Sequence, residues 1–218
     1  MQIIAMITML IDHVGIVFFP NDATSELWRI IGRIAFPLYA YALVLGYHRT
    51  SNVRQYLLRL ALLAIVSQWP FQAAFDTTGI NAIGTLFVCL LALYALDFVS
   101  ARPLQYSLSM AIKLAIVAVS AALLEIGDFD YGYYAVALVL IYRYTRPKVQ
   151  VLLHFVLNVA VLFDKGWILQ FYSLFSTVLL AFLPDFLRAA DRIRPPRWVW
   201  RSFYPVHLAV LAIAAALL

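Results

Sequence analysis

Long apolar runs with few charges fill most of this chain, and they set the strongest limit on what it can fold into. Of its 218 residues, 65% are hydrophobic and 12% are charged, whereas soluble domains average about 45–50% apolar and about 25% charged residues. A helix needs roughly 20 apolar residues to cross the hydrocarbon layer of a bilayer. We therefore predict an all-α, polytopic transmembrane helical bundle that forms a single domain over residues 1–218, and we exclude an ordinary soluble fold.

Roughly nine segments have the length and composition of a membrane span. Their expected ranges are 3–19, 29–47, 54–72, 81–98, 106–124, 131–144, 149–163, 167–187 and 202–218. The sixth and seventh are short, so eight crossings are the alternative count.

Lysine and arginine gather in alternate connections between these segments, which predicts the orientation of the chain. Positive loops face the cytoplasm, and the positive connections hold Arg49, Arg54, Arg102, Arg143, Arg146, Lys148, Arg188, Arg192, Arg194, Arg197 and Arg201. The other connections are neutral or acidic, with Asp76, Glu125, Asp128, Asp130, Asp164 and Lys165. We expect a cytoplasmic N-terminus. The net charge of +5 is explained by these loops, so no nucleic-acid partner is expected.

Several ionisable residues fall inside the apolar runs, where a charge costs about 2.5–3.5 kcal/mol on insertion scales. Asp12 lies near the middle of the first segment and is followed by His13. Histidine is the side chain best suited to accept and return a proton near neutral pH. Arg33 lies deep in the second segment, four residues before Pro37, which predicts a kinked helix with a free carbonyl beside the guanidinium.

Other polar residues within the segments fit a structural role as well as a functional one. Tyr204 and His207 are three residues apart and share a face of the last segment; spacing alone favours an interfacial tyrosine and a buried histidine. The remaining set is Gln68, Asn81, Tyr131, His154 and Asn158. Each of these suits a helix cap, an interhelical hydrogen bond or an aromatic anchor.

Several kinds of site lack the residues they need. The only cysteine, Cys89, excludes an intramolecular disulfide and a cysteine-based metal cluster. The chain has no HExxH, GxSxG or GxxxxGK[ST] motif, which excludes the zinc, serine-hydrolase and P-loop chemistry that those motifs mark. We expect no metal.

Six stretches, taken in order, resemble the motifs of the F-pilin N-acetylase (TraX) family. They are LIDHVGIVFF, GRIAFPLYAYALVLGYHR, IVSQWPF, NAIGTLF, DYGYYAVALVL and FYPVHLAVL, and they span nearly the whole chain. The resemblance implies a bacterial inner-membrane acyltransferase that moves an acetyl group from acetyl-CoA to an amine or hydroxyl, with a pilin N-terminus, a small molecule or a glycan as acceptor. It marks Asp12 and His13, Gly32, Arg33 and Pro37, Gln68, Asn81, Tyr131 with Gly132, and Tyr204 with His207.

These residues support a mechanism that we state as a hypothesis. His13 would act as general base, Asp12 or another acid would orient it, and Arg33 would stabilise the oxyanion of the thioester carbonyl. His207 or Tyr204 is the alternative partner for either residue of the first pair. The phosphates of coenzyme A are expected near His48, Arg49, Arg54 and Arg59, although the positive-inside rule alone explains the same charges. A proton-coupled transporter that uses these groups as a relay is the alternative function.

Overall fold

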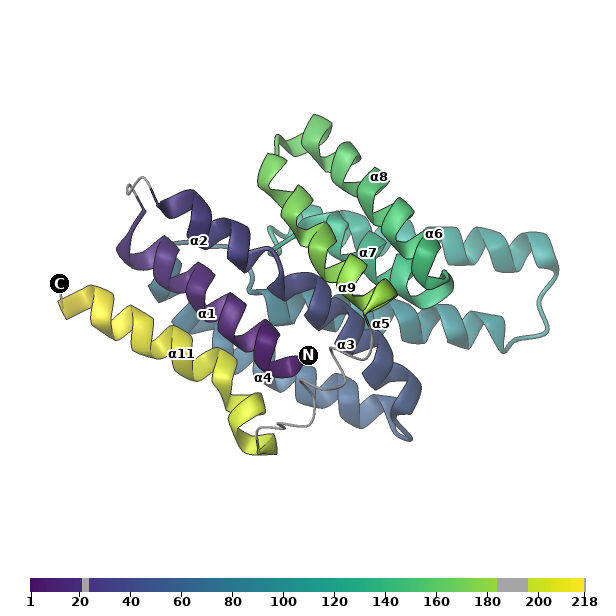
Figure 1. Cartoon of the computed structure of the whole chain (residues 1–218). Coiled ribbons are helices and arrows are strands. Elements are labelled where there is room, and N and C mark those ends of the chain that lie inside the picture. Colours follow the sequence, from purple (N-terminus) through teal and green to yellow (C-terminus); the bar gives the residue numbers. More distant parts are fainter. Residues whose placement is uncertain (21–23, 184–195, 218) are drawn as a thin grey trace.

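The computed structural model describes residues 1–20, 24–183 and 196–217, and these residues fold into a bundle of helices (Figure 1). The helices are α1 (Gln2–Phe18), α2 (Ser25–Gly32), α3 (Ala35–Arg49), α4 (Val53–Phe75), α5 (Ala82–Ser100), α6 (Tyr106–Ile126), α7 (Gly132–Tyr144), α8 (Pro147–Lys165), the 3₁₀ helix η1 (Ile168–Ser173), α9 (Leu174–Phe182) and α11 (Arg197–Leu217). The all-α prediction is confirmed for this part of the chain. Its β-structure is limited to an isolated bridge between Ile80 and Phe129.

Among the described residues, six helical segments are long and apolar enough to cross a membrane. They are Ser25–Arg49, Val53–Phe75, Ala82–Ser100, Tyr106–Ile126, Pro147–Lys165 and Trp198–Leu217. Each of the nine predicted segments contains a helix, but Gln2–Phe18 and Ile168–Phe182 are shorter, and α7 has 13 residues. The predicted count of nine is therefore not confirmed. The end of the predicted 167–187 segment and the loop arginines Arg188, Arg192 and Arg194 lie outside the described residues.

The second predicted segment is interrupted at the arginine that sequence analysis singled out. Helix α2 ends at Gly32, α3 begins at Ala35, and Arg33 lies between them. Pro37 has no N–H with which to bond the carbonyl of Arg33, so the helical hydrogen-bond ladder cannot run through this point. Ser176 on α9 donates to the carbonyl of Ile34 at 2.8 Å and stabilises the interruption.

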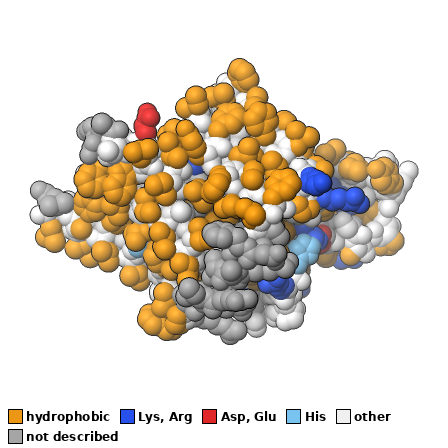
Figure 2. All heavy atoms as spheres, viewed as in Figure 1, with side chains coloured by type: hydrophobic (Ala, Val, Ile, Leu, Met, Phe, Trp, Pro, Cys, Tyr) orange, Lys and Arg blue, Asp and Glu red, His pale blue; other side chains and the backbone are white. Residues whose placement is uncertain are grey.

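The surface of the bundle is apolar, unlike that of a soluble protein, and several polar side chains share its interior with an apolar core. Large apolar side chains cover the surface (Figure 2), and only 11% of the α6 span is buried in the bundle, compared with 61% of α5. Polar side chains are instead buried, among them His154, Asn158 and Thr177, each with no exposed surface. This arrangement suits a protein whose solvent is hydrocarbon, because buried polar groups then bond to one another.

The helices alternate in direction, so the connections gather at two opposite ends of the bundle. We call the end with the α3–α4 connection and the start of α11 the basic end, because it carries Arg49, Arg54, Arg59 and Arg201. The opposite end, with Asp76, Glu125, Asp128, Asp130 and Asp164, is the acidic end. The sequence pattern of alternating loop charge thus corresponds to two distinct ends of one bundle.

Two connections at the acidic end are bonded to each other and hold the helices that follow them. The N–H of Ile80 donates to the carbonyl of Asp128 at 2.9 Å, and the N–H of Asp130 donates to the carbonyl of Ile80 at 2.8 Å. Asn81 caps α5 by accepting from the N–H groups of Ile83 and Gly84, which satisfies donors at the start of the helix. These bonds fix the backbone of Asp130 against the connection between α4 and α5.

Candidate functional site

Two histidines from opposite ends of the chain meet inside the bundle. His13 on α1 and His207 on α11 are 194 residues apart, yet Nδ1 of His13 and Nε2 of His207 are separated by 2.8 Å. Their rings are nearly parallel, with centroids 5.0 Å apart. The ring centroid of Phe75 lies 4.9 Å from that of His13, and the ring centroid of Phe203 lies 4.6 Å from that of His207. An aromatic ring thus packs against each histidine of the pair.

The hydrogen bonds of the pair determine its tautomers when both rings are neutral. Nδ1 of His207 lies 2.7 Å from the carbonyl of Phe203, and a carbonyl can only accept, so this nitrogen carries the proton. Nε2 of His207 must then accept, and Nδ1 of His13 donates to it. This assignment leaves Nε2 of His13 with a free lone pair. A histidine in this state can act as a base or as a nucleophile.

Asp12 is held against α2 and does not orient His13. Its Oδ1 lies 3.5 Å from Nε of Arg29, and within the described residues no hydrogen bond joins it to the imidazole of His13. Among the partners left open for His13, the geometry favours His207 over Asp12, because adjacent helical positions point about 100° apart. Gly32 allows this approach: a Cβ at that position would collide with the side chain of Asp12.

A cavity of about 1070 Å³ extends from the histidine pair to the basic end. Asp12, His13 and Tyr204 line its deep part, and Thr50, Arg59 and Arg201 line the part near the basic end. Most of the lining between them is apolar or aromatic. Tyr204 is buried, and its ring centroid lies 5.6 Å from that of His207. The cavity therefore connects His13 with the basic end.

A second cavity, of about 630 Å³, enters from the acidic end. Arg29 and Arg33 line it, and Nη1 of Arg33 donates to Oε1 of Gln170 at 3.4 Å. Asp130 and Tyr131 line both cavities, so the two spaces adjoin at this pair. Burial raises the pKa of Asp130 to about 6, against the opposing effect of Arg33, which places its titration in the physiological range.

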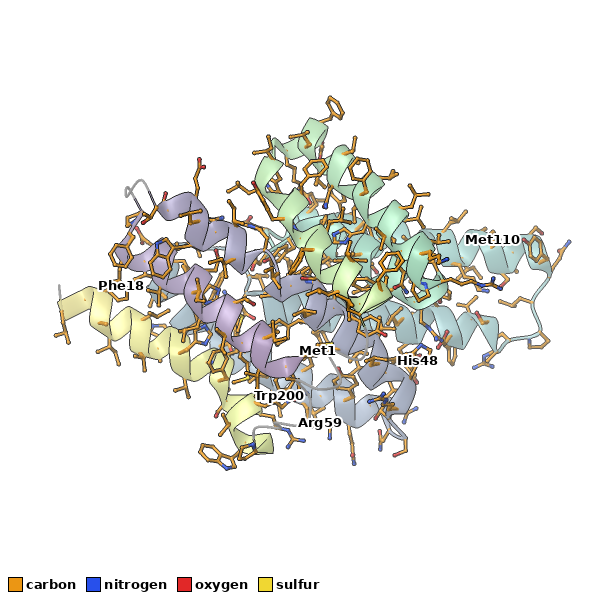
Figure 3. The ribbon with its side chains drawn as sticks, in the orientation of Figure 1. Met1, Phe18, His48, Arg59, Met110 and Trp200 are labelled. Carbon is orange, nitrogen blue, oxygen red and sulfur yellow. The ribbon has the colours of Figure 1, made fainter. Side chains whose placement is uncertain are left out.

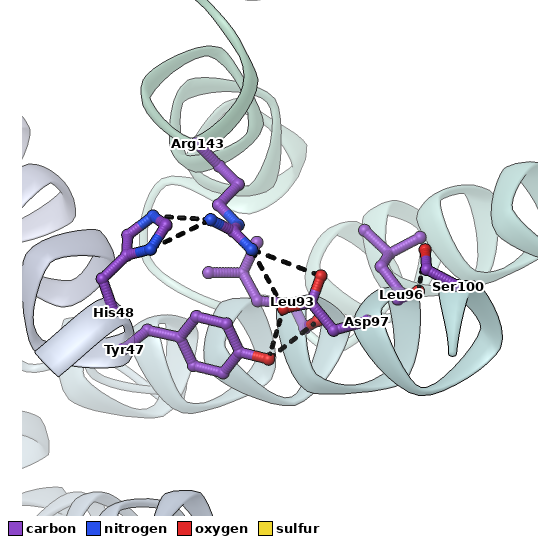
Figure 4. A network of polar contacts seen from close by, with 7 residues as sticks. All are labelled: Tyr47, His48, Leu93, Leu96, Asp97, Ser100 and Arg143. Atoms are coloured by element: carbon purple, nitrogen blue, oxygen red, sulfur yellow. Dashed lines mark hydrogen bonds and ion pairs between the residues drawn. The ribbon is translucent and has the colours of Figure 1, made fainter. Parts of the chain in front are cut away.

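The basic residues predicted to bind coenzyme A separate into two groups. Arg59 lines the larger cavity, whereas His48, Arg49 and Arg54 do not. Both ring nitrogens of His48 face Nη1 of Arg143, at 3.1 and 2.6 Å. Arg143 also donates to Asp97 at 3.0 Å (Figure 4). In Figure 3 the labelled Arg59 lies near Trp200, away from His48.

The remaining polar residues predicted from the sequence bind one another and form structural networks. Nδ2 of Asn81 donates to Oε1 of Gln68 at 2.6 Å, which joins α5 to α4. His154 lies 2.7 Å from the hydroxyl of Tyr134 and 2.5 Å from that of Thr177. The amide of Asn158 is 3.5 Å from the hydroxyl of Ser173. These contacts give Gln68, Asn81, His154 and Asn158 structural partners within the bundle.

Asp130, Gln170 and Arg201 line the cavities but were not predicted as site residues. Asp130 lies in the acidic aromatic turn EIGDFDYGYY, and its local signal was that of a loop carboxylate. Gln170 and Arg201 carry no sequence motif, and only the packing of η1 and α11 brings them to the cavities. Within residues 1–20, 24–183 and 196–217, no group of three or more His, Cys, Asp or Glu side chains could hold a metal ion.

Comparison with known proteins finds a matching family model and a similar fimbrial assembly protein. The family model described as TraX protein matches residues 1–215. The chain is also similar to the probable fimbrial assembly protein FimC, serogroup H1, of Dichelobacter nodosus, with 27% identity over 245 residues. That similarity covers 98% of this chain and 93% of the relative. No solved structure matches the chain.

Proposed function

The chain belongs to the TraX family, and on this premise we propose that it is a membrane acyltransferase. It would move an acetyl or other short acyl group from acyl-CoA to an amine or hydroxyl acceptor. The basic end would face the cytoplasm of the bacterial inner membrane, because positive loops stay on that side. Acyl-CoA would then reach His13 through the larger cavity, and the acceptor would enter through the smaller one.

The observation that supports this proposal most directly is the histidine pair at the deep end of the larger cavity. His207 accepts from Nδ1 of His13 and is itself fixed by the carbonyl of Phe203. Nε2 of His13 is thereby left free in a site that positions it. A structural histidine normally uses both of its nitrogens, as His154 does in this bundle. His13 instead has the arrangement that a general base requires.

Direct transfer needs one proton movement in each direction at Nε2 of His13. The acceptor nitrogen or oxygen gives its proton to Nε2 as it attacks the carbonyl carbon of the thioester. The resulting tetrahedral intermediate then collapses, its C–S bond breaks, and the protonated His13 returns the proton to the leaving sulfur. The products are the acylated acceptor and free coenzyme A.

Other residues at the junction of the cavities would assist this reaction. Arg33 remains the proposed partner of the oxyanion, because a fixed guanidinium stabilises negative charge as it develops. Asp130 lies beside Arg33 and faces both cavities, so its carboxylate would attract a protonated amine and take up its extra proton. The neutral amine would then attack the thioester. Tyr204 would limit the space around the imidazole pair.

Several classes of acceptor fit the proposal, whereas the proposed donor is acyl-CoA. The relative from Dichelobacter nodosus is named as a probable fimbrial assembly protein, which supports the N-terminal amine of a pilin-like subunit as one candidate. The described lining of the smaller cavity has one more carboxylate than it has cations, with Glu26, Glu125, Asp128 and Asp130 against Arg29, Arg33 and Lys165. A net negative charge favours binding of a cationic amine over a neutral hydroxyl.

Transfer from radiolabelled acetyl-CoA to a set of amine and hydroxyl acceptors, catalysed by the purified protein in lipid vesicles, tests the proposal. We expect saturable turnover by the wild type and a loss of about 10²–10⁴-fold in His13→Ala, the range of a general base. Phe163→Ala serves as control, because this side chain is 86% exposed on the outer surface of α8. Undiminished turnover in His13→Ala would exclude His13 as the base.

A proton-coupled transporter remains the second candidate, since two cavities that meet at ionisable residues also suit alternating access. The two functions give different results with the same vesicles. Thioester turnover without solute flux supports the transferase. Proton-dependent flux with neither coenzyme A binding nor thioester turnover supports the transporter.

A further inference from the structure

We infer that the mouth of the larger cavity is a nucleotide site, in which Arg59 and Arg201 bind the phosphates of the donor and Trp200 contacts its adenine. This inference rests on the proposed function, because it concerns the donor of the same reaction. It differs from the sequence prediction, in which His48, Arg49 and Arg54 accompanied Arg59. The argument depends on the distribution of charge, the aromatic residues and the length of the cavity.

The charges of the larger cavity are separated along its length. Among the described residues that line it, the acidic ones are Asp12 and Asp130, and Asp12 adjoins His13 in the sequence. Its arginines, Arg59 and Arg201, lie toward the basic end. Among the described residues neither guanidinium forms an ion pair, whereas Arg29 and Arg143 do. A ligand that fits this gradient carries its negative charge at the end farthest from His13.

Aromatic side chains accompany the two arginines. Trp200 stacks on Tyr39 with ring centroids 5.8 Å apart and an angle of 15° between the planes. The guanidinium of Arg59 lies 5.9 Å from the centroid of the Tyr56 ring. All four residues line the cavity, and Figure 3 shows Arg59 and Trp200 in the same region. Aromatic rings and guanidinium planes are the groups on which proteins stack nucleotide bases.

The part of the larger cavity between its mouth and His13 has the length and the apolar lining to hold an extended part of a ligand. Gln2 and His13 both line the cavity, and their positions on α1 are roughly 16 Å apart along the helix axis at about 1.5 Å per residue. The lining between these points is mainly apolar, with Met9, Leu43 and Leu86 among its residues. Acyl-CoA has a phosphorylated adenosine at one end, a thioester at the other and a thin arm between them. Its ends match the ends of the cavity.

A donor that lacks the nucleotide separates this inference from the proposed function. S-acetylpantetheine keeps the arm and the thioester but has neither phosphates nor adenine. We expect the double variant Arg59→Gln/Arg201→Gln to raise KM for acetyl-CoA by at least about 100-fold, since it removes two charge-assisted bonds to phosphate. Its kcat should stay near the wild-type value, and its KM for S-acetylpantetheine should change less than twofold.

The control removes the same charge from the same end of the bundle. Arg102 and Lys148 lie at the basic end outside the cavity, so Arg102→Gln/Lys148→Gln should leave both KM values unchanged. An equal loss for both donors in the cavity variant would overturn the nucleotide site, as would an equal rise of KM for acetyl-CoA in the control. Trp200→Ala should also weaken acetyl-CoA selectively, and Trp200→Phe should restore part of the loss.

Direct binding of adenosine 3′,5′-bisphosphate, measured by calorimetry in detergent, keeps the two proposals distinct. Binding that the cavity variant loses supports the nucleotide site, even if the wild type transfers no acyl group. Turnover of both donors without nucleotide binding supports the transferase and overturns the nucleotide site.

Discussion

Replacement of Gly32 by alanine tests the close approach of α1 and α2 on which the site depends. The new methyl group would meet Cβ and Cγ of Asp12 and would lie 2.5 Å from its Oδ1. Nonbonded heavy atoms settle at about 3.5–4.0 Å, so the two helices must separate by at least about 1 Å. The ion pair between Asp12 and Arg29, now at 3.5 Å, would open, and His13 would move with α1.

We expect Gly32→Ala to lower both the stability of the protein and its turnover. Inserting a methyl group into a packed interior costs about 1–3 kcal/mol, and each kcal/mol lowers Tm by about 2–4 °C for a chain of this size. A displacement of about 1 Å at a catalytic group reduces the rate about 10²-fold. Turnover should therefore fall more steeply than Tm in Gly32→Ala.

The assay for unfolding uses the single cysteine of the chain. Cys89 is buried, so a thiol-reactive fluorescent dye reports its exposure as the protein is heated in detergent. Gly46→Ala is the matched control for melting alone, because its methyl group would meet the hydroxyl of Tyr56 at 2.9 Å, and that flexible side chain can turn aside. Its turnover is not compared, since Gly46 and Tyr56 line the larger cavity. If Gly32→Ala melts and turns over like the wild type, the reasoning about the helix contact is refuted.

Three further variants probe other parts of the structure. His207→Leu removes the acceptor for Nδ1 of His13 and should lower turnover about 10–100-fold and change its pH profile. His207→Gln should recover part of the lost turnover. Equal rates in both variants would reject a positioning role for His207. Asn81→Ala removes a buried cap and should lower the free energy of unfolding by about 1–2 kcal/mol or more, measured by thermal unfolding, while the exposed cap variant Asn52→Ala should cost less. Asp130, whose pKa burial raises to about 6, is ionised above that pH, so turnover should decline as pH falls through about 6, and Asp130→Asn should lack this inflection. If Asp130→Asn has the same pH profile as the wild type, Asp130 does not contribute to the pH dependence of turnover.

The individual membrane segments and the interruption at Arg33 could be read from the sequence, because each depends on nearby residues. Hydrophobic length predicts a helix that can span the bilayer, and Pro37 removes a donor within its own helix. The count of spans could not be read in the same way. Helix α7 has 13 residues but is extensively buried, so its stability comes from its neighbours.

The site shows the same division between local and distant information. Sequence singled out His13 and His207 because polar groups are costly in an apolar segment, but it left open whether Asp12, His207 or Tyr204 bonds to His13. The position of Arg201 at the mouth of the cavity was also not predicted. Both results depend on how α11 packs against α1 and α4.

The sequence by itself determined that this chain is helical, apolar on its surface and a member of the TraX family, because hydropathy and motif order belong to the chain alone. Only the tertiary structure decided that His13 bonds to His207, that Asp12 pairs with Arg29, and that two cavities meet at Asp130. The physical reason is that insertion into a membrane depends on the residues of each segment, whereas a hydrogen bond depends on the relative position of two segments. Packing between helices sets that position.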